Sequence, residues 1–504
     1  MADKIGTAGR DRLRLAAVSL GALVLCAAYV WRGYFSSDFW EHAAVVRELS
    51  VRPFAPTHPL LAIDAPHAYF SPYLLLLGLT TRGTGAAPIW VLAAAGLVNV
   101  VLLVLAFRRF LVRLFPTGEA AAPYALLFIL FLWGRDAWPW SGFLHVGFLG
   151  YAASYPSTFA AAAMFLAWSL LLDWLAGRRP LSLVGIGLLV ALCLITHPPT
   201  ALVLLAGLAA MFLARVQGNL VANGAVLAGA VGAGTAAALA WPYFPVLQLF
   251  VAQPPEFHAW SAVFYQGVPA HIWPALVALP VLLWRLRRDR RDPLVLLVVL
   301  LAAVYALGAV TGKYGLGRVI AYIVVCIQIA LGAAVALWES RLPARRAWLA
   351  PAVCLLASLA LFAYDRPPLP RILRYQRPLW RELEGILGPV RPGDVVLADS
   401  YTSYPVPVLT GGRVVAWRHP VYWVPDHAQR REAQDRFFGA ATDDERRAVI
   451  ARYHVRWVLV NPQAVHLEPR EEERLRVLGC VVAERDSLVL VELARLCSPP
   501  RRRT

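Results

Sequence analysis

The stretch SSDFWEH, residues 36–42, places two carboxylates and an imidazole directly after a long apolar run. Asp38, Glu41 and His42 have the i, i+3, i+4 spacing that puts side chains on one face of a helix. A carboxylate in such a group can take a proton from a hydroxyl as a general base. The same face could hold a divalent metal, although no second acidic cluster has matching spacing. Asp38 and Glu41 also fit an acidic capping box, which would not exclude catalysis.

Further polar side chains stand in other segments between apolar runs. His58 lies in THPLL, and His67 and Tyr69 lie in DAPHAYF, both soon after the opening motif. Polar groups among aromatic rings suit a sugar, whereas Lys and Arg suit a phosphate. The other candidates are Arg135 and Asp136 in GRDAW, His197 in THPPT, and Lys313, Tyr314 and Arg318 in TGKYGLGR. Each also has a plainer interpretation. The histidines would be hydrogen-bonded residues at the membrane interface, Arg135 and Asp136 a local ion pair, and the cations anchors of a helix end.

The elements that must position these groups are membrane helices. Of the 504 residues, 59% are hydrophobic and 16% are charged, an apolar fraction above that of soluble domains. Apolar stretches recur at the length that crosses a hydrocarbon core of about 30 Å, so the sequence predicts a polytopic α-helical membrane protein with eleven spans. The predicted spans are 13–31, 86–107, 120–133, 154–175, 181–196, 198–214, 221–241, 272–284, 293–311, 318–338 and 348–363.

Basic residues concentrate in alternate connections between these helices, as the positive-inside rule requires. The pattern predicts a multi-pass protein of the plasma membrane with a cytoplasmic N-terminus and an outer C-terminus. The first apolar run, Leu13–Trp31, has no small-residue cleavage site and is therefore interpreted as a retained helix. The formal charge of +17 is carried mainly by these connections and by the tail, without a nucleic-acid motif, so we expect no nucleic-acid partner.

Two segments outside the membrane are long enough to have structure of their own. The first outer segment, 32–85, contains the apolar run Tyr69–Thr81, which is predicted to lie as an interfacial helix on the outer leaflet. In the tail, β-like runs alternate with helical segments, notably 426–453, which predicts a small α/β domain after a Pro/Arg-rich linker. Cys480 and Cys497 are a possible disulfide pair there. The predicted strands are at 394–400, 413–417, 456–461 and 480–493, and the predicted domains are 1–363, the transmembrane module, and 364–504, the extracytoplasmic α/β domain.

This layout resembles the type-C glycosyltransferase (GT-C) superfamily, polytopic enzymes that use polyprenyl-phosphate sugars on the outer face of the membrane. An acidic residue follows the first span in that family, and Asp38 occupies this position. A His-Pro segment and a short interfacial helix come next, which THPLL and HAYFSPYLLLL resemble. GRDAW is similar to the family's second acidic motif, and a basic residue in a late outer turn, here Lys313 or Arg318, contacts the lipid phosphate.

Two features depart from the family pattern. The usual first motif has two adjacent acids, whereas Phe39 and Trp40 separate Asp38 from Glu41. Either acid is therefore a candidate for the base. The oligosaccharyltransferase signature WWD is absent from the tail, which argues against the Asn-glycosylating branch.

The resemblance implies an inverting membrane glycosyltransferase with Asp38 as general base. Its partners would be a polyprenyl-phosphate-sugar donor, a glycan, lipid or protein acceptor of the cell envelope, and the bilayer. Asp136 and the histidines would orient hydroxyl groups, and no cofactor is required, although Mg²⁺ or Mn²⁺ is a weaker alternative. The rival functions are a lipid or polysaccharide flippase, which usually needs ionisable groups near the membrane midplane, and a non-catalytic envelope-assembly subunit. The assembly subunit would tolerate loss of Asp38.

Overall fold

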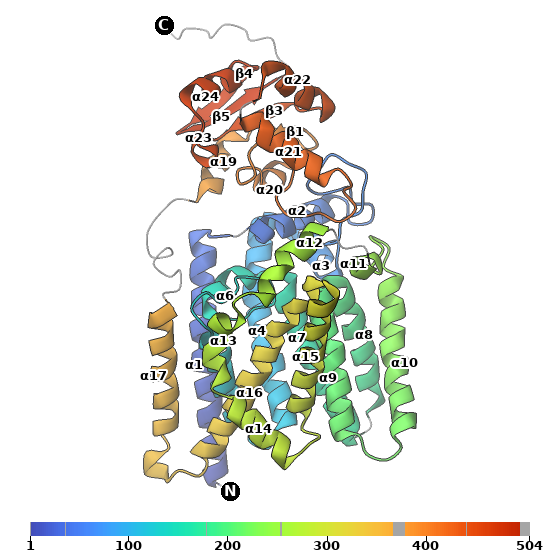
Figure 1. The fold of residues 1–504 in the computed structure, drawn as a ribbon, viewed down its shortest axis with the longest axis vertical. Helices are drawn as coiled ribbons and strands as arrows, with labels where there is room; N and C mark the ends of the chain where they lie inside the picture. The colour runs from blue at the N-terminus through green and yellow to red at the C-terminus, as the bar shows by residue number, and fades with distance from the viewer. Residues whose placement is uncertain are drawn as a thin grey trace. The chain divides into compact units, whose positions relative to one another are not determined.

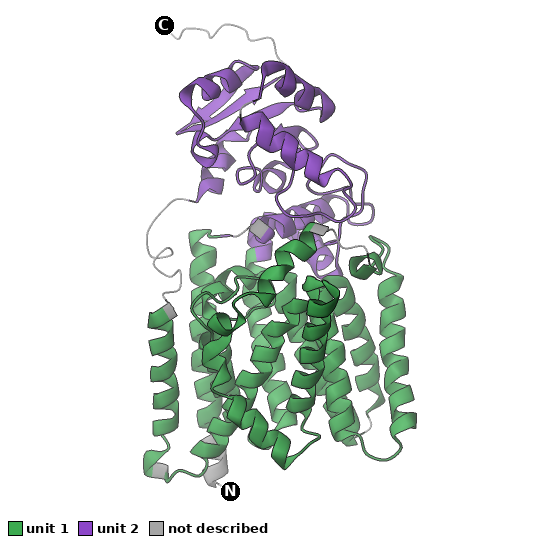
Figure 2. Ribbon diagram, viewed as in Figure 1, with its two compact units in different colours: residues 1–34, 93–374 green, residues 35–92, 375–504 purple. Residues whose placement is uncertain are grey.

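The computed structural model describes residues 2–35, 37–177, 179–251, 255–365, 378–439 and 441–493. They form two compact units, which are described separately below (Figure 2). Unit 1 comprises residues 1–34 and 93–374, and unit 2 comprises residues 35–92 and 375–504. Each unit combines chain segments that are distant in sequence, and helix α4 (Pro88–Leu114) contains the change from unit 2 to unit 1.

Unit 1 is a bundle of long apolar helices with short helices between them (Figure 1). Every predicted span has a helical counterpart, the eighth as a bent pair. Besides α4, the helices are α1 (Ala2–Arg32), α5 (Gly118–Phe131), α6 (Val146–Ala152), α7 (Pro156–Gly177), α8 (Pro180–Thr196), α9 (Pro198–Arg215), α10 (Leu220–Leu239), α11 (Gln248–Val251), α12 (Pro255–Ser261), η1 (Ala262–Tyr265), α13 (Val268–Leu276), α14 (Leu279–Arg288), α15 (Pro293–Thr311), η2 (Tyr314–Val319), α16 (Ile320–Glu339), η3 (Ala344–Arg346) and α17 (Leu349–Asp365).

The predicted count of eleven spans is larger than the structure supports. Within the described ranges, seven helices are long and apolar enough to cross a membrane, or eight when α13 and α14, bent by 61°, count as one span. Three further apolar helices, α5, α8 and α17, fall below the length required. The 14 residues of α5, for example, rise only about 21 Å, less than the hydrocarbon core of about 30 Å. The structure therefore supports seven or eight candidate spans, and the remaining predicted spans are not confirmed.

Small residues allow the helices of unit 1 to pack closely. Gly332 of α16 lies against Ala125 of α5, and Gly234 of α10 lies against Gly187 of α8, with no room for a Cβ at either glycine. Such contacts are typical of helix packing in membranes, where small residues let two backbones approach. Asp173, near the end of α7, forms ion pairs with Arg109 at 2.8 Å and Arg113 at 2.7 Å, which links α7 to α4.

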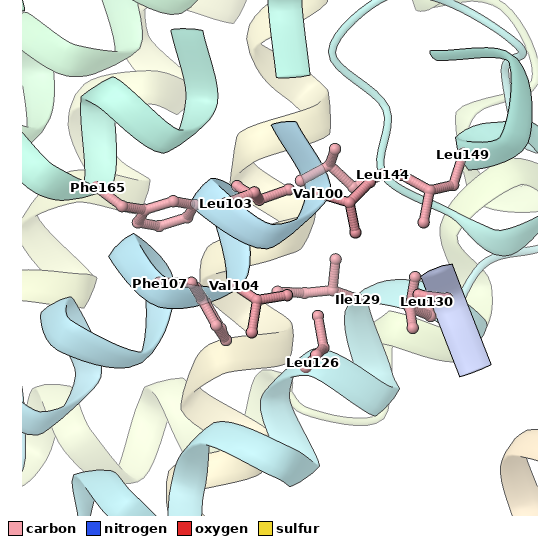
Figure 3. A pocket seen from close by; sticks show the side chains of 11 residues that line it. Val100, Leu103, Val104, Phe107, Leu126, Ile129, Leu130, Leu144, Leu149 and Phe165 are labelled. Carbon is pink, nitrogen blue, oxygen red and sulfur yellow. The ribbon is translucent and has the colours of Figure 1, made fainter. Parts of the chain in front are cut away.

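A small cavity between α1, α4, α5, α6 and α7 is lined only by apolar side chains (Figure 3). Its volume is about 20 Å³, roughly the space of one water molecule. A water there would find no hydrogen-bond partners, so we expect the cavity to be dry. It has no chemical groups for a reaction, and the candidate site must lie elsewhere.

Unit 2 contains a five-stranded mixed sheet with the order β2-β1-β3-β5-β4 (Figure 1). Strand β1 is parallel to β2 and β3, whereas β5 is antiparallel to β3 and β4. Its core consists of apolar side chains from β1, β3 and β5 with Phe437 and Phe438 from the helical layer. The elements are α2 (Ser37–Val51), α3 (Pro72–Thr84), α19 (Leu379–Ile386), β1 (Val395–Leu397), α20 (Val406–Thr410), β2 (Arg413–Val414), α21 (His427–Phe438), α22 (Asp443–Arg452), β3 (Trp457–Val460), α23 (Pro462–Val465), α24 (Pro469–Arg476), β4 (Cys480–Arg485) and β5 (Leu488–Glu492).

The sheet confirms the predicted α/β character of the tail and refines its details. The predicted strand 480–493 is two strands, because Asp486 adopts a left-handed conformation, with a φ of 54°, and turns the chain between them. The predicted helical segment 426–453 is α21 and α22, separated where Thr442 begins α22 with a capping box. The predicted interfacial helix exists as α3, while its position at a membrane stays a prediction. Cys497 and most of the linker lie outside the described residues.

The first outer segment joins the tail within unit 2. Leu61 forms a parallel bridge with Val414, and the Val414 N–H donates to the Leu60 carbonyl at 2.8 Å, which extends the sheet beyond β2. Beside this bridge, the Arg413 guanidinium donates to the buried Glu48 carboxylate at 2.7 Å. Residues far apart in sequence therefore build one structural unit.

Replacing Glu48 with Gln should lower the free energy of unfolding of unit 2 by about 2 kcal/mol, because a charged hydrogen bond between largely buried groups is lost. Arg413 keeps its contacts with Thr57 and the Pro59 carbonyl, so the loss is partial. Thermal unfolding in detergent would measure the effect. The matched control is Glu432→Gln, which removes an exposed ion pair with Arg436 and should change stability by no more than about 0.5 kcal/mol. Equal effects would contradict a stabilising role for the Glu48–Arg413 pair.

Candidate functional site

Helix α2 positions the acidic motif, and it gives the two acids different environments. Asp38 lies in the first turn, where a carboxylate is favoured by the helix dipole, and its side chain is 35% exposed. Glu41, one turn later, is buried. The helix is held by α3, whose Gly78 packs directly against Leu49. Asp38 and Glu41, predicted to share one face of the helix, therefore lie in different surroundings: Asp38 is partly exposed to solvent and Glu41 lies in the interior of unit 2.

The Glu41 carboxylate is occupied on both oxygens. The indole N–H of the buried Trp417 donates to Oε2 at 3.3 Å, and Nε2 of His67 lies 3.3 Å from Oε1. His67 Nδ1 accepts the backbone N–H of Tyr69, so a neutral ring carries its proton on Nε2, facing Glu41. Burial acts to raise the pKa of Glu41, but His67 and the other nearby imidazoles lower it below its ordinary value. Glu41 is thus expected to be ionised near pH 7.

Two more predicted histidines are buried beside this pair. His58 Nδ1 accepts the backbone N–H groups of Leu60 and Leu61, and its ring meets the His67 ring edge-on with centroids 5.0 Å apart. The His42 ring contacts the Tyr69 ring at 4.7 Å. Burial lowers the pKa of His58 well below its usual range and that of His42 to about 4. Both imidazoles are therefore neutral near pH 7, so they pack in the interior beside Glu41 and add no positive charge there.

The low pKa of His42 predicts that unit 2 loses stability in mild acid. In the unfolded chain, His42 binds a proton once the pH falls below its ordinary pKa of 6.5. In the folded protein, His42 stays neutral down to about pH 4. Stability should therefore fall across this window by up to about 1.4 kcal/mol per pH unit from this group. The measurement is the unfolding temperature in detergent at several pH values between 7 and 4.5, with His42→Gln expected to reduce the slope. Replacing the exposed His454 with Asn is the control, and a His42→Gln slope equal to that of wild type would contradict the assignment.

Sequence reasoning missed the partners that the tail supplies to Asp38. Nδ1 of His419 lies 3.3 Å from Asp38 Oδ1, and Nε2 of His419 lies 3.3 Å from the Tyr404 hydroxyl. Trp417, the partner of Glu41, was also missed. A signal was present, because the predicted strand RVVAW is followed by Arg-His-Pro, and the carboxyl ends of parallel strands are where polar site residues gather.

A second group of predicted residues lies in unit 1. The His197 Nδ1 accepts the Thr200 N–H at 3.3 Å and its Nε2 lies 3.2 Å from Ser141 Oγ. The Arg318 guanidinium donates to the Ser141 carbonyl at 3.2 Å and lies over the Trp140 ring, 5.7 Å from its centroid. Ser141 thus brings His197 and Arg318 together, which the sequence did not predict.

The remaining predicted residues of unit 1 are less constrained. Arg135, Asp136 and Lys313 are exposed, and within the described part of the chain Arg135 and Asp136 form no ion pair with each other. The local ion pair considered for them is therefore not seen. Tyr314 packs against Tyr265 with ring centroids 5.5 Å apart. The structure thus brings together Asp38, Glu41, His42, His58, His67 and Tyr69 in unit 2, and His197 with Arg318 in unit 1.

The carboxylates and imidazoles do not form a metal site in the described residues. No three His, Cys, Asp or Glu side chains there come together as ligands for an ion. Asp38 pairs with His419 while Glu41 turns to Trp417 and His67, so the i, i+3, i+4 spacing does not converge on one point.

Comparison with known proteins identifies the fold. No protein-family model and no curated protein sequence matches the chain. The crystal structure of the apo oligosaccharyltransferase of Archaeoglobus fulgidus matches with a TM-score of 0.56 and 14% identity, over 89% of this chain and 70% of that chain. The same enzyme tethered to an acceptor peptide with the NVT sequon matches with a TM-score of 0.53 and 12% identity, over 89% and 69% of the two chains. Its complex with Zn and sulfate matches with a TM-score of 0.52 and 12% identity, over 88% and 67%. The chain therefore shares the fold of this archaeal oligosaccharyltransferase.

Proposed function

We propose that the protein is a membrane glycosyltransferase that moves a sugar from a polyprenyl-phosphate donor to a hydroxyl group of a cell-envelope acceptor. The observation that carries this proposal is an accessible carboxylate, Asp38, held by an imidazole at the start of α2 in a chain with the GT-C fold. The positive-inside pattern supports transfer on the outer face of the plasma membrane. An acceptor of the glycan, lipid or protein class satisfies the same chemistry.

In this reaction Asp38 acts as the general base. Its carboxylate takes the proton of the acceptor hydroxyl while that oxygen forms a bond to the anomeric carbon of the sugar. The bond from the anomeric carbon to the phosphate oxygen breaks, and its electron pair leaves with the polyprenyl phosphate. The donor phosphodiester has one negative charge and the departing monoester has two, so the charge lost by Asp38 appears on the phosphate. Attack from the opposite face inverts the anomeric centre.

The surroundings of the two acids favour Asp38 over Glu41 as the base. A general base must reach the substrate proton at hydrogen-bond distance, and the half-exposed Asp38 is accessible. Both Glu41 oxygens already face donors in the interior, the Trp417 indole and His67. Moving Glu41 to a substrate would leave these buried groups without their acceptor. Glu41 therefore supports the fold of the site, and Asp38 performs the proton transfer.

The developing charge on the phosphate needs a cation, and Arg318 is better suited than Lys313. The Arg318 side chain is ordered between the Ser141 carbonyl and the face of Trp140. A guanidinium can also bind two phosphate oxygens at once. Lys313 is exposed, and a flexible ammonium must lose more conformational entropy to hold one position. Asp136 and His197 are proposed to orient hydroxyl groups of the sugar or acceptor.

Sugar transfer by the purified protein in lipid tests the proposal. The donors are labelled polyprenyl-phosphate hexoses and pentoses, offered with a cell-envelope extract as acceptor source, and the product is analysed for anomeric configuration. Transfer with inversion is the expected result. Failure of every donor, with protein that remains folded in the same vesicles, would contradict the proposal and favour the assembly-subunit function.

A further inference from the structure

We propose that His419 is the positioning residue for Asp38, so that the tail of the chain supplies a necessary part of the base. This inference rests on the proposed function, in which Asp38 takes the acceptor proton. The two residues are far apart in sequence and meet in unit 2, where Nδ1 of His419 lies 3.3 Å from Asp38 Oδ1. The pair is accessible, since the side chains of His419 and Asp38 are 23% and 35% exposed.

The hydrogen-bond chain defines which nitrogen of His419 carries the proton. An ionised carboxylate only accepts, so Nδ1–H of a neutral ring donates to Asp38. The other nitrogen, Nε2, then accepts from the Tyr404 hydroxyl at 3.3 Å. The Tyr404 hydroxyl therefore donates to His419, and the His419 N–H donates to Asp38. A third group that orients an imidazole, which in turn orients a reactive group, is a recurring arrangement in catalytic sites.

The backbone around His419 is held from both sides. The buried imidazole of His427, at the start of α21, donates from Nε2 to the carbonyls of Trp417 and His419, at 3.0 and 2.8 Å. Trp417 is anchored in addition by its indole hydrogen bond to Glu41. Pro420 follows directly and fixes its own φ angle. The His419 ring therefore extends from a rigid segment, as a positioning residue requires.

This arrangement would assist Asp38 by positioning it. The N–H of His419 restricts the carboxylate to one orientation, which reduces the entropy lost when the acceptor hydroxyl approaches. His419 need not touch the sugar, so donor binding should be independent of it.

The test compares sugar transfer by wild type, His419→Ala, His419→Asn, Asp38→Asn and the double variant Asp38→Asn/His419→Ala. We expect His419→Ala to lower kcat by roughly 10- to 100-fold with the donor KM unchanged. The Asn amide can still donate to Asp38, so His419→Asn should recover part of the rate. The double variant should be no slower than Asp38→Asn alone, because His419 acts only through Asp38.

The controls separate this inference from the proposed function and from a loss of structure. His454→Asn replaces an exposed histidine of the same unit and should leave kcat unchanged, while unfolding temperatures report the stability of each variant. Full activity of His419→Ala would overturn the inference. So would a double variant whose loss of rate equals the product of the losses in the two single variants. Either result would leave the proposed glycosyltransferase function unchanged. Absence of transfer by wild type would instead overturn the proposed function, and the inference with it.

Discussion

Asp38→Asn is expected to lower the rate of sugar transfer by roughly 10²- to 10⁴-fold, the usual contribution of a general base. The amide has nearly the shape of the carboxylate but cannot accept the hydroxyl proton at neutral pH. Because Asp38 is in the first turn of α2 and partly exposed, the fold should tolerate the change. The loss should appear in kcat, while the donor KM stays close to that of wild type.

The matched control for Asp38→Asn is Asp64→Asn. Asp64 is an exposed acid in the same segment of unit 2 and has no role in the proposed reaction. Measuring initial rates with saturating labelled donor, together with the unfolding temperature, would distinguish lost catalysis from lost structure. If Asp38→Asn transferred sugar as fast as Asp64→Asn, Asp38 would not be the base, and Glu41→Gln would be the next variant to measure.

Arg318→Ala should have the second largest effect, a loss of roughly 10²- to 10³-fold in kcat, comparable to removal of one charge-stabilising group from other active sites. The phosphate gains a negative charge as it departs, and the guanidinium proposed to stabilise this charge is held beside Trp140 and the Ser141 carbonyl. Arg318→Lys should recover only part of the rate, because an ammonium cannot form the bidentate contact. Single-turnover transfer from the lipid-linked donor would measure the chemical step directly.

Lys313→Ala serves as the comparison for Arg318→Ala, since Lys313 precedes the short helix η2 and Arg318 lies in its last turn. Lys313 is exposed, and its attraction for a phosphate is screened by salt, so we expect a change of no more than about threefold. A larger loss of kcat in Lys313→Ala than in Arg318→Ala would indicate that Lys313, not Arg318, contacts the phosphate.

The helices of unit 1 were largely predictable because an apolar stretch of sufficient length is a local property of the sequence. The predicted number of eleven spans was not confirmed, since α5, α8 and α17 are apolar but shorter than the helices that qualify as candidate spans. The bend of 61° between α13 and α14 was also not predicted, although prolines stand near this break at Pro274 and Pro280. Apolarity indicates burial or lipid contact, and only geometry distinguishes the two.

The candidate site was only half predictable. Asp38, Glu41, His42, His58 and His67 belong to short motifs that lie near one another in sequence, and the structure does gather them in unit 2. Their partners Trp417 and His419 come from the distant tail, and no local pattern records such a pairing. The difference between the two acids follows from these partners, which bury Glu41 and leave Asp38 accessible. One sequence could therefore identify two candidate bases but could not rank them.

The composition of unit 2 from residues 35–92 and 375–504 also affects how the protein is made. During synthesis, α2 emerges early, whereas the segment with Trp417 and His419 emerges only after all of unit 1 has been translated. Until then Asp38 lacks His419, and Glu41 and Glu48 lack Trp417 and Arg413. We therefore expect prematurely terminated chains that lack the tail to leave these carboxylates without their partners. Translation of the tail would therefore be the step that completes the proposed site.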